Sequence, residues 1–197
     1  MTSRPREPSG AAVFRSSVTD AITDAALASL VDQGYAKLSM EGVARRAGVG
    51  KSALYRRWPS KVDMVTDVLT HLSVPTDDPP DTGTLHGDVR ALLQAIADWL
   101  ADPRMRAVLP SLIAEYDRNP ALAAASATHI GEPRRAWGRA ALDHAVGRGE
   151  LTPAQAEILL DLVAAPVHWR LVHGRPVDAD YLDQLADLLC RGVGHTG

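Results

Sequence analysis

Apolar side chains recur along most of this chain every three or four residues, which is the spacing of one face of an α-helix. The first such segment covers residues 14–34 and ends at a glycine, a residue suited to the C-terminus of a helix. Its inward face consists of Val18, Ile22, Ala26 and Leu30. No run of alternating apolar and polar residues suggests a strand. The pattern therefore predicts an all-α protein.

Capping and turn residues divide the chain into nine predicted helices. A segment rich in Pro and Asp, residues 75–83, cannot form a regular element and separates four helices from five. Three later helices begin with a capping residue followed by Pro, at Asp102-Pro103, Asn119-Pro120 and Thr152-Pro153. The nine helices are predicted to cover about residues 14–34, 40–47, 51–58, 60–72, 84–101, 103–118, 120–147, 153–173 and 179–191.

This order of elements predicts two helical domains joined by a short linker. Residues 14–72 would form the first domain, residues 73–83 the linker, and residues 84–197 the second domain. Residues 1–13 carry arginines and prolines but lack the apolar region of a secretory signal. We therefore expect them to form a flexible basic arm.

The composition is that of an ordinary globular protein, with 46% hydrophobic and 23% charged residues. The single cysteine, Cys190, excludes an intrachain disulfide and a cysteine-based zinc site. No apolar run approaches the roughly 18 to 20 residues needed to cross a bilayer. These features lead us to expect a cytoplasmic protein that has no membrane partner.

Charge is distributed unevenly along the chain. The protein has a net charge of −3, yet residues 1–72 hold ten basic and seven acidic residues. Residues 37–61 alone hold seven basic residues and one acid, Glu41. A local positive excess on an acidic protein commonly attracts phosphate, whereas a solvated helix face usually mixes both signs. Charge alone leaves both interpretations open.

Residues 38–61 have the sequence features of a helix-turn-helix. The packing positions of a short first helix are small or apolar: Val43, Ala44 and Ala47. Gly48 suits the turn because it adopts backbone conformations that other residues resist. Leu54 would anchor a second helix whose remaining positions are largely polar or basic. This arrangement predicts a DNA-recognition helix that begins near Lys51.

The same segment resembles the signature of the TetR (tetracycline-repressor-like) family of transcriptional regulators. That signature is an Ile/Val-Ala-x-x-Ala-Gly-Val run, followed by Leu-Tyr-x-x-aromatic and a Lys three residues later. It corresponds here to residues 43–49, residues 54–58 and Lys61. The resemblance implies an all-α, nine-helix, two-domain architecture. An N-terminal helix-turn-helix bundle would bind DNA, and a C-terminal helical domain would bind a ligand and dimerise.

The resemblance also implies roles for individual residues. Tyr55 and Lys61 would contact phosphates, Ser39 would place the first helix against the DNA backbone, and Lys51 would address guanine. Glu41 departs from those relatives that have a basic residue there, and it would either pair with a neighbouring Arg or read cytosine N4. The predicted DNA-binding residues are Ser39, Glu41, Arg45, Arg46, Gly50, Lys51, Ser52, Ala53, Tyr55, Arg56, Arg57 and Lys61.

Other functions are less well supported by the sequence. Gly50-Lys51-Ser52 looks like the end of a P-loop, but Arg45 stands where that motif requires glycine and no buried strand precedes it. An acidic cluster lacks the spacing of a calcium loop and is expected to be solvated: Asp77, Asp78, Asp81, His86 and Asp88. No catalytic triad or zinc motif is present. We therefore expect neither enzyme activity nor a bound metal or cofactor.

The second domain is expected to bind a small molecule. Large aromatic side chains in a helical domain favour a cavity between helices, although any one of them could be an ordinary core residue. The resemblance adds that family members release DNA when an effector binds there, and we expect this effector to be apolar or aromatic. The predicted ligand contacts are Trp99, Met105, Leu109, Leu112, Tyr116, His129, Trp137 and Trp169.

The last two predicted helices have apolar faces that are wider than one packed stripe requires. A two-fold four-helix interface between two copies would use the excess. The predicted dimer contacts are Leu159, Leu162, Val163, Tyr181, Leu185 and Leu188. The sequence therefore predicts a homodimeric repressor that a small molecule releases from palindromic double-stranded DNA. Two alternatives stay open, namely a transcriptional activator and an interaction module whose basic patch binds an acidic partner.

Overall fold

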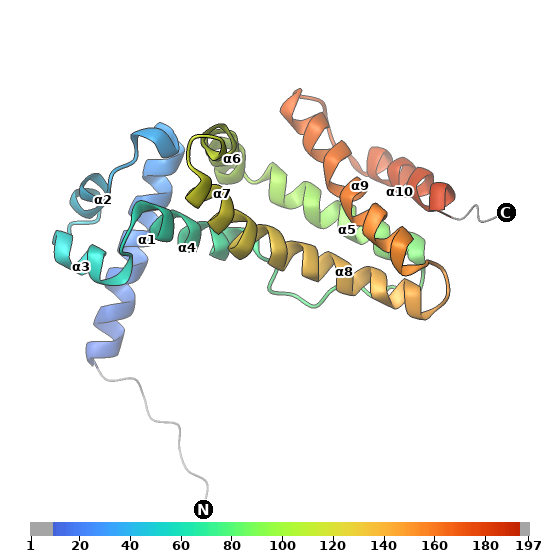
Figure 1. The fold of residues 1–197 in the computed structure, drawn as a ribbon, viewed down its shortest axis with the longest axis horizontal. Helices are drawn as coiled ribbons and strands as arrows, with labels where there is room; N and C mark the ends of the chain where they lie inside the picture. The colour runs from blue at the N-terminus through green and yellow to red at the C-terminus, as the bar shows by residue number, and fades with distance from the viewer. Residues whose placement is uncertain (1–9, 194–197) are drawn as a thin grey trace, which may run out of the picture. The chain divides into compact units, whose positions relative to one another are not determined.

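The structure is a computed structural model that describes residues 10–193, with side chains from residue 18 onward (Figure 1). Within these residues the backbone forms nine continuous helical stretches and no strand, so the predicted all-α, nine-helix fold is confirmed. The helices are α1 (Gly10–Lys37), α2 (Met40–Arg46), α3 (Lys51–Arg57), α4 (Lys61–Ser73), α5 (Leu85–Ala101), α6 (Pro103–Tyr116), α7 (Pro120–Ser126), the π-helical turn η1 (Ala127–Gly131), α8 (Glu132–Gly147), α9 (Pro153–Val172) and α10 (Ala179–Val193).

Capping residues set most of these bounds. The side chains of Ser39, Thr84 and Thr152 accept hydrogen bonds from the first turns of α2, α5 and α9. The three predicted starts at a cap followed by Pro are all observed, at the first residues of α6, α7 and α9. Elements α7, η1 and α8 follow one another without a break, so the long helix predicted over residues 120–147 is also present.

The N-terminal part of the chain differs from the sequence prediction in one respect. Most of the expected arm, residues 1–9, lies outside the described residues. Residues 10–13 are helical, because α1 begins at Gly10 and continues through two alanines, which have the highest helix propensity. At the other end of α1, Gly34 has a φ of 73° and interrupts the regular helix where the sequence predicted a stop.

The chain divides into two compact units. Of the described residues, the first unit contains those up to Leu72 together with Ala107–Ala125, and the second contains Ser73–Arg106 and those from Ser126 onward. Residues 107–125 therefore pack with the N-terminal helices, although they follow the predicted linker. Two side chains make this connection. Tyr35 N–H donates to Ser111 Oγ over 3.4 Å, and Asn119 Nδ2 donates to the Tyr35 hydroxyl over 3.1 Å.

Helices α1 to α4 of the first unit enclose an apolar core. The largest side chains buried in these helices are Ile22, Leu30, Tyr35, Leu54, Met64 and Leu69. Trp58 is 3% exposed and its Nε1 donates to Asp67 Oδ2 over 2.9 Å, so this aromatic residue has a packing role. The core fixes the position of the short helices α2 and α3.

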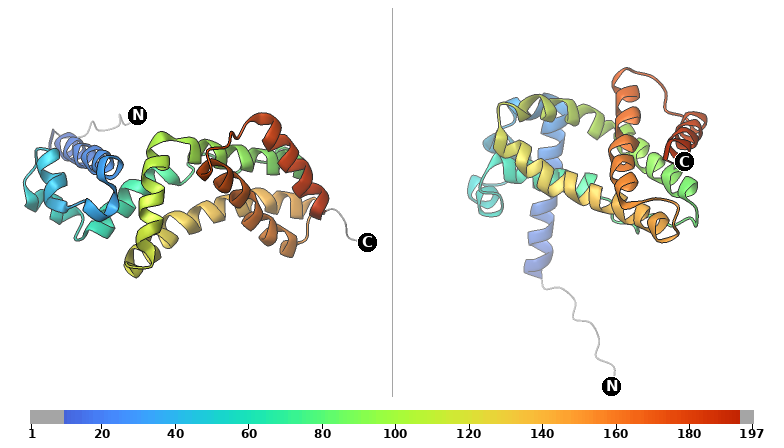
Figure 2. Two further views of the ribbon diagram at one scale, coloured as in Figure 1. Left: turned by 90° about the horizontal axis from the view of Figure 1, so that it is seen from above. Right: turned by 45° about the vertical axis from the view of Figure 1, so that its right-hand side comes forward.

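In the second unit, α5 lies at the centre and packs against α8, α9 and α10 (Figure 2). The interface contains fully buried leucines and valines, including Val89, Leu93, Leu142 and Leu159. Gly138 allows α8 and α9 to approach closely, since a Cβ at that position would lie 3.1 Å from Leu160 Cδ2. No helix in residues 10–193 combines enough length and apolar character to cross a membrane.

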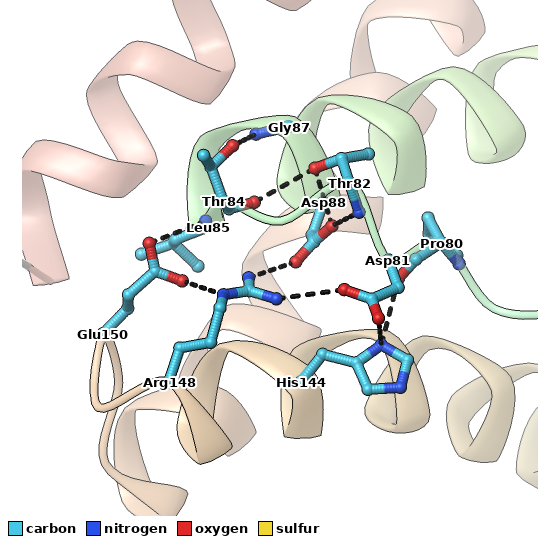
Figure 3. A network of polar contacts seen from close by, with 10 residues as sticks. All are labelled: Pro80, Asp81, Thr82, Thr84, Leu85, Gly87, Asp88, His144, Arg148 and Glu150. Atoms are coloured by element: carbon cyan, nitrogen blue, oxygen red, sulfur yellow. Dashed lines mark hydrogen bonds and ion pairs between the residues drawn. The ribbon is translucent and has the colours of Figure 1, made fainter.

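A network of charges fastens the segment between α4 and α5 to the end of α8 (Figure 3). Arg148 pairs with Asp88 at 2.6 Å, Asp81 at 3.1 Å and Glu150 at 2.7 Å. The backbone N–H and hydroxyl of Thr82 donate to Asp88 Oδ1. The expectation of a solvated acidic cluster is therefore wrong for Asp88, whose side chain is completely buried, whereas Asp81 is paired but 55% exposed.

The electrostatics of Asp88 follow from these contacts. Burial alone would raise the pKa of this carboxyl group, but the hydrogen bonds from Thr82 and Arg148 outweigh that effect and hold its pKa below the usual value. Because the charged form is favoured in the folded chain, the network stabilises this unit at neutral pH.

Candidate nucleic-acid interface and effector site

A tight turn joins α2 to α3. Gly48 has a φ of 67°, and its N–H donates to the Arg45 carbonyl over 3.3 Å. The N–H of Val49 reaches back to the Ala44 carbonyl over 3.0 Å, which completes a Schellman motif. A side chain at position 48 would be strained in this left-handed conformation. The predicted turn glycine thus has its expected role.

Helix α3 has one buried and one exposed face. Leu54 is completely buried and anchors the helix in the core of the first unit. Tyr55 is 42% exposed, and four other polar or basic residues of α3 are exposed: Lys51, Ser52, Arg56 and Arg57. Ala53 is half-buried. The exposed face therefore carries most of the residues that were predicted to contact DNA from this helix.

The basic residues around this face differ in their contacts. Among the described residues, Arg45 and Arg56 are exposed and form no ion pair. Arg57 lies over the Trp58 ring at 5.1 Å, while Arg46 pairs with Asp32 of α1 at 2.6 Å. Arg45 and Arg56 are consequently the cations most available for phosphate.

Glu41 pairs with two predicted DNA contacts and not with an arginine. The Tyr55 hydroxyl donates to Glu41 Oε1 over 3.4 Å, and Lys51 Nζ lies 3.5 Å from the same oxygen. A hydrogen bond from its own backbone N–H and the charge of Lys51 lower the pKa of Glu41. This acid therefore stays ionised and orients two side chains at the start of the recognition surface.

The side chain of Lys61 forms its contacts within the first unit. Its Nζ donates to the carbonyls of Tyr35 at 2.8 Å and Leu38 at 3.1 Å, and lies 4.1 Å from the centre of the Tyr35 ring. Burial lowers the pKa of Lys61, although Glu115 opposes this effect. These contacts hold the α1–α2 connection and occupy two of the three donors of the ammonium group, so the phosphate contact of Lys61 stays a prediction.

The predicted ligand contacts are divided between the two compact units. Leu109, Leu112 and Tyr116 belong to the first unit, whereas the other five belong to the second. His129 is exposed and Trp169 is 68% exposed on α9. Three residues of the second unit have buried or partly buried positions: Trp99, Met105 and Trp137.

Trp99 contacts Arg134 and Met105 contacts Ser73, and neither Arg134 nor Ser73 was among the predicted ligand contacts. The guanidinium carbon of Arg134 lies 3.9 Å from the centre of the Trp99 ring, and Arg134 Nη1 donates to the Ser73 carbonyl. The Ser73 hydroxyl faces Met105 Sδ at 3.8 Å. Trp137 is separate, because its Nε1 donates to the Asp77 carbonyl over 2.8 Å and holds the segment before α5.

The predicted dimer contacts fall into two groups. Leu159, Val163 and Leu185 lie in the core of their own unit, so their side chains are not available to a second copy. Leu162 and Leu188 are exposed and Tyr181 is partly exposed. An exposed apolar stripe along α9 consists of Ile158, Leu162, Trp169 and Val172.

The tight α2–α3 turn and the exposed basic face of α3 define a helix-turn-helix DNA-binding protein. Two family models match the chain: "Bacterial regulatory proteins, tetR family" over residues 22–68, and "Tetracyclin repressor-like, C-terminal domain" over residues 79–189. The chain belongs to the TetR family of DNA-binding transcriptional regulators.

Two relatives illustrate the similarity. The DNA-binding transcriptional repressor TetR of Mycobacteroides abscessus is 30% identical, over 85% of this chain and 88% of its own length. The HTH-type transcriptional regulator YdeS of Bacillus subtilis is 29% identical, over 89% of each chain.

Solved structures have the same fold. The TetR family transcription regulator SCO0332 is 31% identical, with a TM-score of 0.67 over 89% of this chain and 98% of that one. The flavonoid-responsive regulator FrrA is 21% identical, with a TM-score of 0.71 over 89% of this chain and 94% of that one. The helical fold predicted from the sequence is therefore found in experimental structures.

Proposed function

We propose that this protein is a homodimeric repressor that binds a palindromic operator and releases it when a small molecule binds the second unit. The observation that best supports this proposal is the exposed face of α3, because Lys51, Tyr55 and Arg56 on that face can reach base edges and phosphates of DNA. The M. abscessus relative that is named a repressor supports this direction of regulation. A regulator of chromosomal genes would act in the bacterial cytoplasm.

Dimerisation is proposed because one helix-turn-helix is too small to specify an operator alone. Helix α9 offers an apolar surface for a second copy, since Ile158, Leu162, Trp169 and Val172 are spaced by helical turns and are 43–68% exposed. Leu188 on α10 is also 68% exposed. Apolar side chains that are this exposed on two helices are typical of an interface.

The effector is proposed to bind within the second unit, near Trp99 and Met105. Trp99 is partly buried and Met105 is 3% exposed, so both provide apolar surface away from solvent. An effector can act on DNA binding only through a difference in its affinity for the free and DNA-bound arrangements. A coupling of about 1 to 3 kcal/mol would change operator affinity about 5- to 150-fold.

The proposed function is tested by selecting bound fragments from a pool of random DNA duplexes. We expect one enriched palindrome, bound by two chains, with half-site centres separated by about one helical turn or a multiple of it. A reporter gene placed behind that palindrome should be silenced when the protein is expressed. Activation of the reporter would reverse the proposed direction, and the absence of any enriched sequence would contradict specific DNA binding.

A further inference from the structure

Arg134, in the first turn of α8, is a half-buried cation with no carboxylate beside it in the described part of the chain. Among the described residues its contacts are the Ser73 carbonyl, which accepts from Nη1, and the Trp99 ring, whose centre is 3.9 Å from the guanidinium carbon. Neither group supplies a negative charge. Burial lowers the pKa of Arg134 to about 10, which reflects the cost of removing its charge from water.

Most other arginines of the second unit are neutralised. Ion pairs to Asp or Glu are formed by Arg90, Arg104, Arg135, Arg139, Arg148 and Arg191. A buried charge that lacks a partner destabilises a folded protein, whereas a paired charge recovers much of the cost. Arg134 is therefore a partly buried cation whose charge is not balanced by a carboxylate among the described residues.

Two more hydrogen-bond donors at the same place lack a good acceptor. Trp99 Nε1 is buried and has no hydrogen-bond partner among the described residues. The Ser73 hydroxyl is 2% exposed, and its acceptor there is the sulfur of Met105, which accepts hydrogen bonds only weakly. Trp99 contacts Arg134 through its ring and Ser73 through its backbone carbonyl, so both donors belong to residues that meet at one position beside the guanidinium.

We infer that this position binds the carboxylate of an organic acid whose body is flat and apolar. A carboxylate has the charge that Arg134 lacks and enough lone pairs for several donors. Trp99 and Met105 would contact the apolar body. The inference rests on the proposed function, because it names the chemical class of the effector. It narrows the expectation of an apolar or aromatic molecule to an acid.

The test uses the full-length protein and pairs of probes that differ mainly in charge. Benzoate, 1-naphthoate and indole-3-acetate are compared with their neutral amides by tryptophan fluorescence and thermal shift. We expect at least one acid to bind, with its amide bound about 10-fold more weakly or worse. Replacing Arg134→Gln should weaken binding of the acid about 10- to 100-fold, and Arg134→Lys should retain part of the affinity.

Arg175→Gln is the matched control, because Arg175 is an exposed arginine of the same unit. This change should leave the affinity for the acid unaltered. Without a probe, Arg134→Gln should have a Tm equal to or above that of the wild type, because it removes an unpaired buried charge. A Tm lower by more than about 5 °C would mean that Arg134 is a structural residue and would overturn the inference.

Four further results would overturn the inference: equal affinity for acids and amides, no binding of any acid, unaltered binding by Arg134→Gln, or displacement of the acid by equimolar phosphate. Operator affinity is measured for each variant so that two failures can be separated. Operator binding without acid binding contradicts the carboxylate class alone. Acid binding that leaves operator affinity unchanged supports the site but contradicts the proposed release of DNA.

Discussion

In the first unit, Arg45 and Arg56 are exposed and form no ion pair with the described residues, whereas in the second unit Arg148 is held by three carboxylates. These arginines thus have different uses. Unpaired exposed arginines leave their donors available to phosphates, while Arg148 fastens loops and helix ends. Arg134 belongs to the second unit but has no carboxylate partner within residues 10–193.

The charged regions of the two units should also respond differently to salt and to pH. The positive excess around α3 lies on an exposed surface, so binding there should depend strongly on salt. Asp88, at the centre of its network, is completely buried, so its contribution should appear as folding stability and respond to pH. Each of the following substitutions should change either DNA binding or folding stability and leave the other largely unchanged. The first is an exception, because it tests assembly.

The largest effect is expected from Leu162→Glu on α9. This change places a charge on an exposed apolar stripe and would leave it buried in a dimer interface. We expect monomers in analytical ultracentrifugation and loss of operator binding, with helicity retained. Ile113→Glu is a suitable control, since Ile113 is a comparably exposed apolar residue of the first unit. A persistent dimer would place the interface elsewhere.

Arg56→Glu should reduce DNA affinity next most strongly, by about 100-fold at moderate salt. The change reverses a charge on the exposed face of α3, where Arg56 has no ion pair among the described residues to lose. Fluorescence anisotropy at several salt concentrations should also show a shallower salt dependence, while the Tm stays constant. Arg175→Glu provides the same reversal in the second unit. An equal loss from both variants would show that only net charge matters.

Asp88→Asn should act on stability and not on DNA contacts. It removes the buried charge that accepts from Thr82 and Arg148, and we expect the Tm to fall by about 4–8 °C. The folded pKa of Asp88 lies below its unfolded value, so its contribution is complete above about pH 4 and is lost as pH falls through the folded pKa. The wild type should lose more stability than the variant over that range. Parallel pH profiles would contradict this account.

Lys61→Ala should have the smallest effect, a Tm decrease of about 2–4 °C. The change removes the hydrogen bonds from Nζ to the Tyr35 and Leu38 carbonyls. Because this ammonium group is occupied inside the first unit, the salt dependence of DNA binding should stay unaltered. Lys37→Ala, at an exposed lysine, is the control for stability. A shallower salt dependence for Lys61→Ala would restore the phosphate contact inferred from the family resemblance.

The DNA-binding region could be predicted from the sequence because its residues are contiguous. Caps and the turn glycine act within a few residues, so residues 39–61 already contain the information that positions α2 and α3. The hydrogen bonds of Lys61 could not be predicted from the sequence, since their acceptors are backbone carbonyls more than 20 residues earlier. Family resemblance identified the lysine but not its contacts.

The helices of the second unit could be predicted from the sequence, but its candidate effector site could not. Arg134, Trp99 and Ser73 come from three separate elements, and nothing in their local sequence indicates that they meet. Periodicity identified Leu159 as apolar without showing that it faces the core of its own unit. The burial of Asp88 depends on Arg148, 60 residues later, which made a solvated loop the natural expectation.

Comparing the operators selected by wild type and by Lys51→Ala tests most directly whether α3 reads the bases. Lys51 is exposed at the start of α3, and its removal should alter base contacts without altering the fold. We predict two palindromes of equal spacing that differ at the same base position in both half-sites, with no change for Arg175→Ala. Identical motifs from wild type and Lys51→Ala, or altered motifs without two-fold symmetry, would contradict the assignment of α3 as the recognition helix of a dimer.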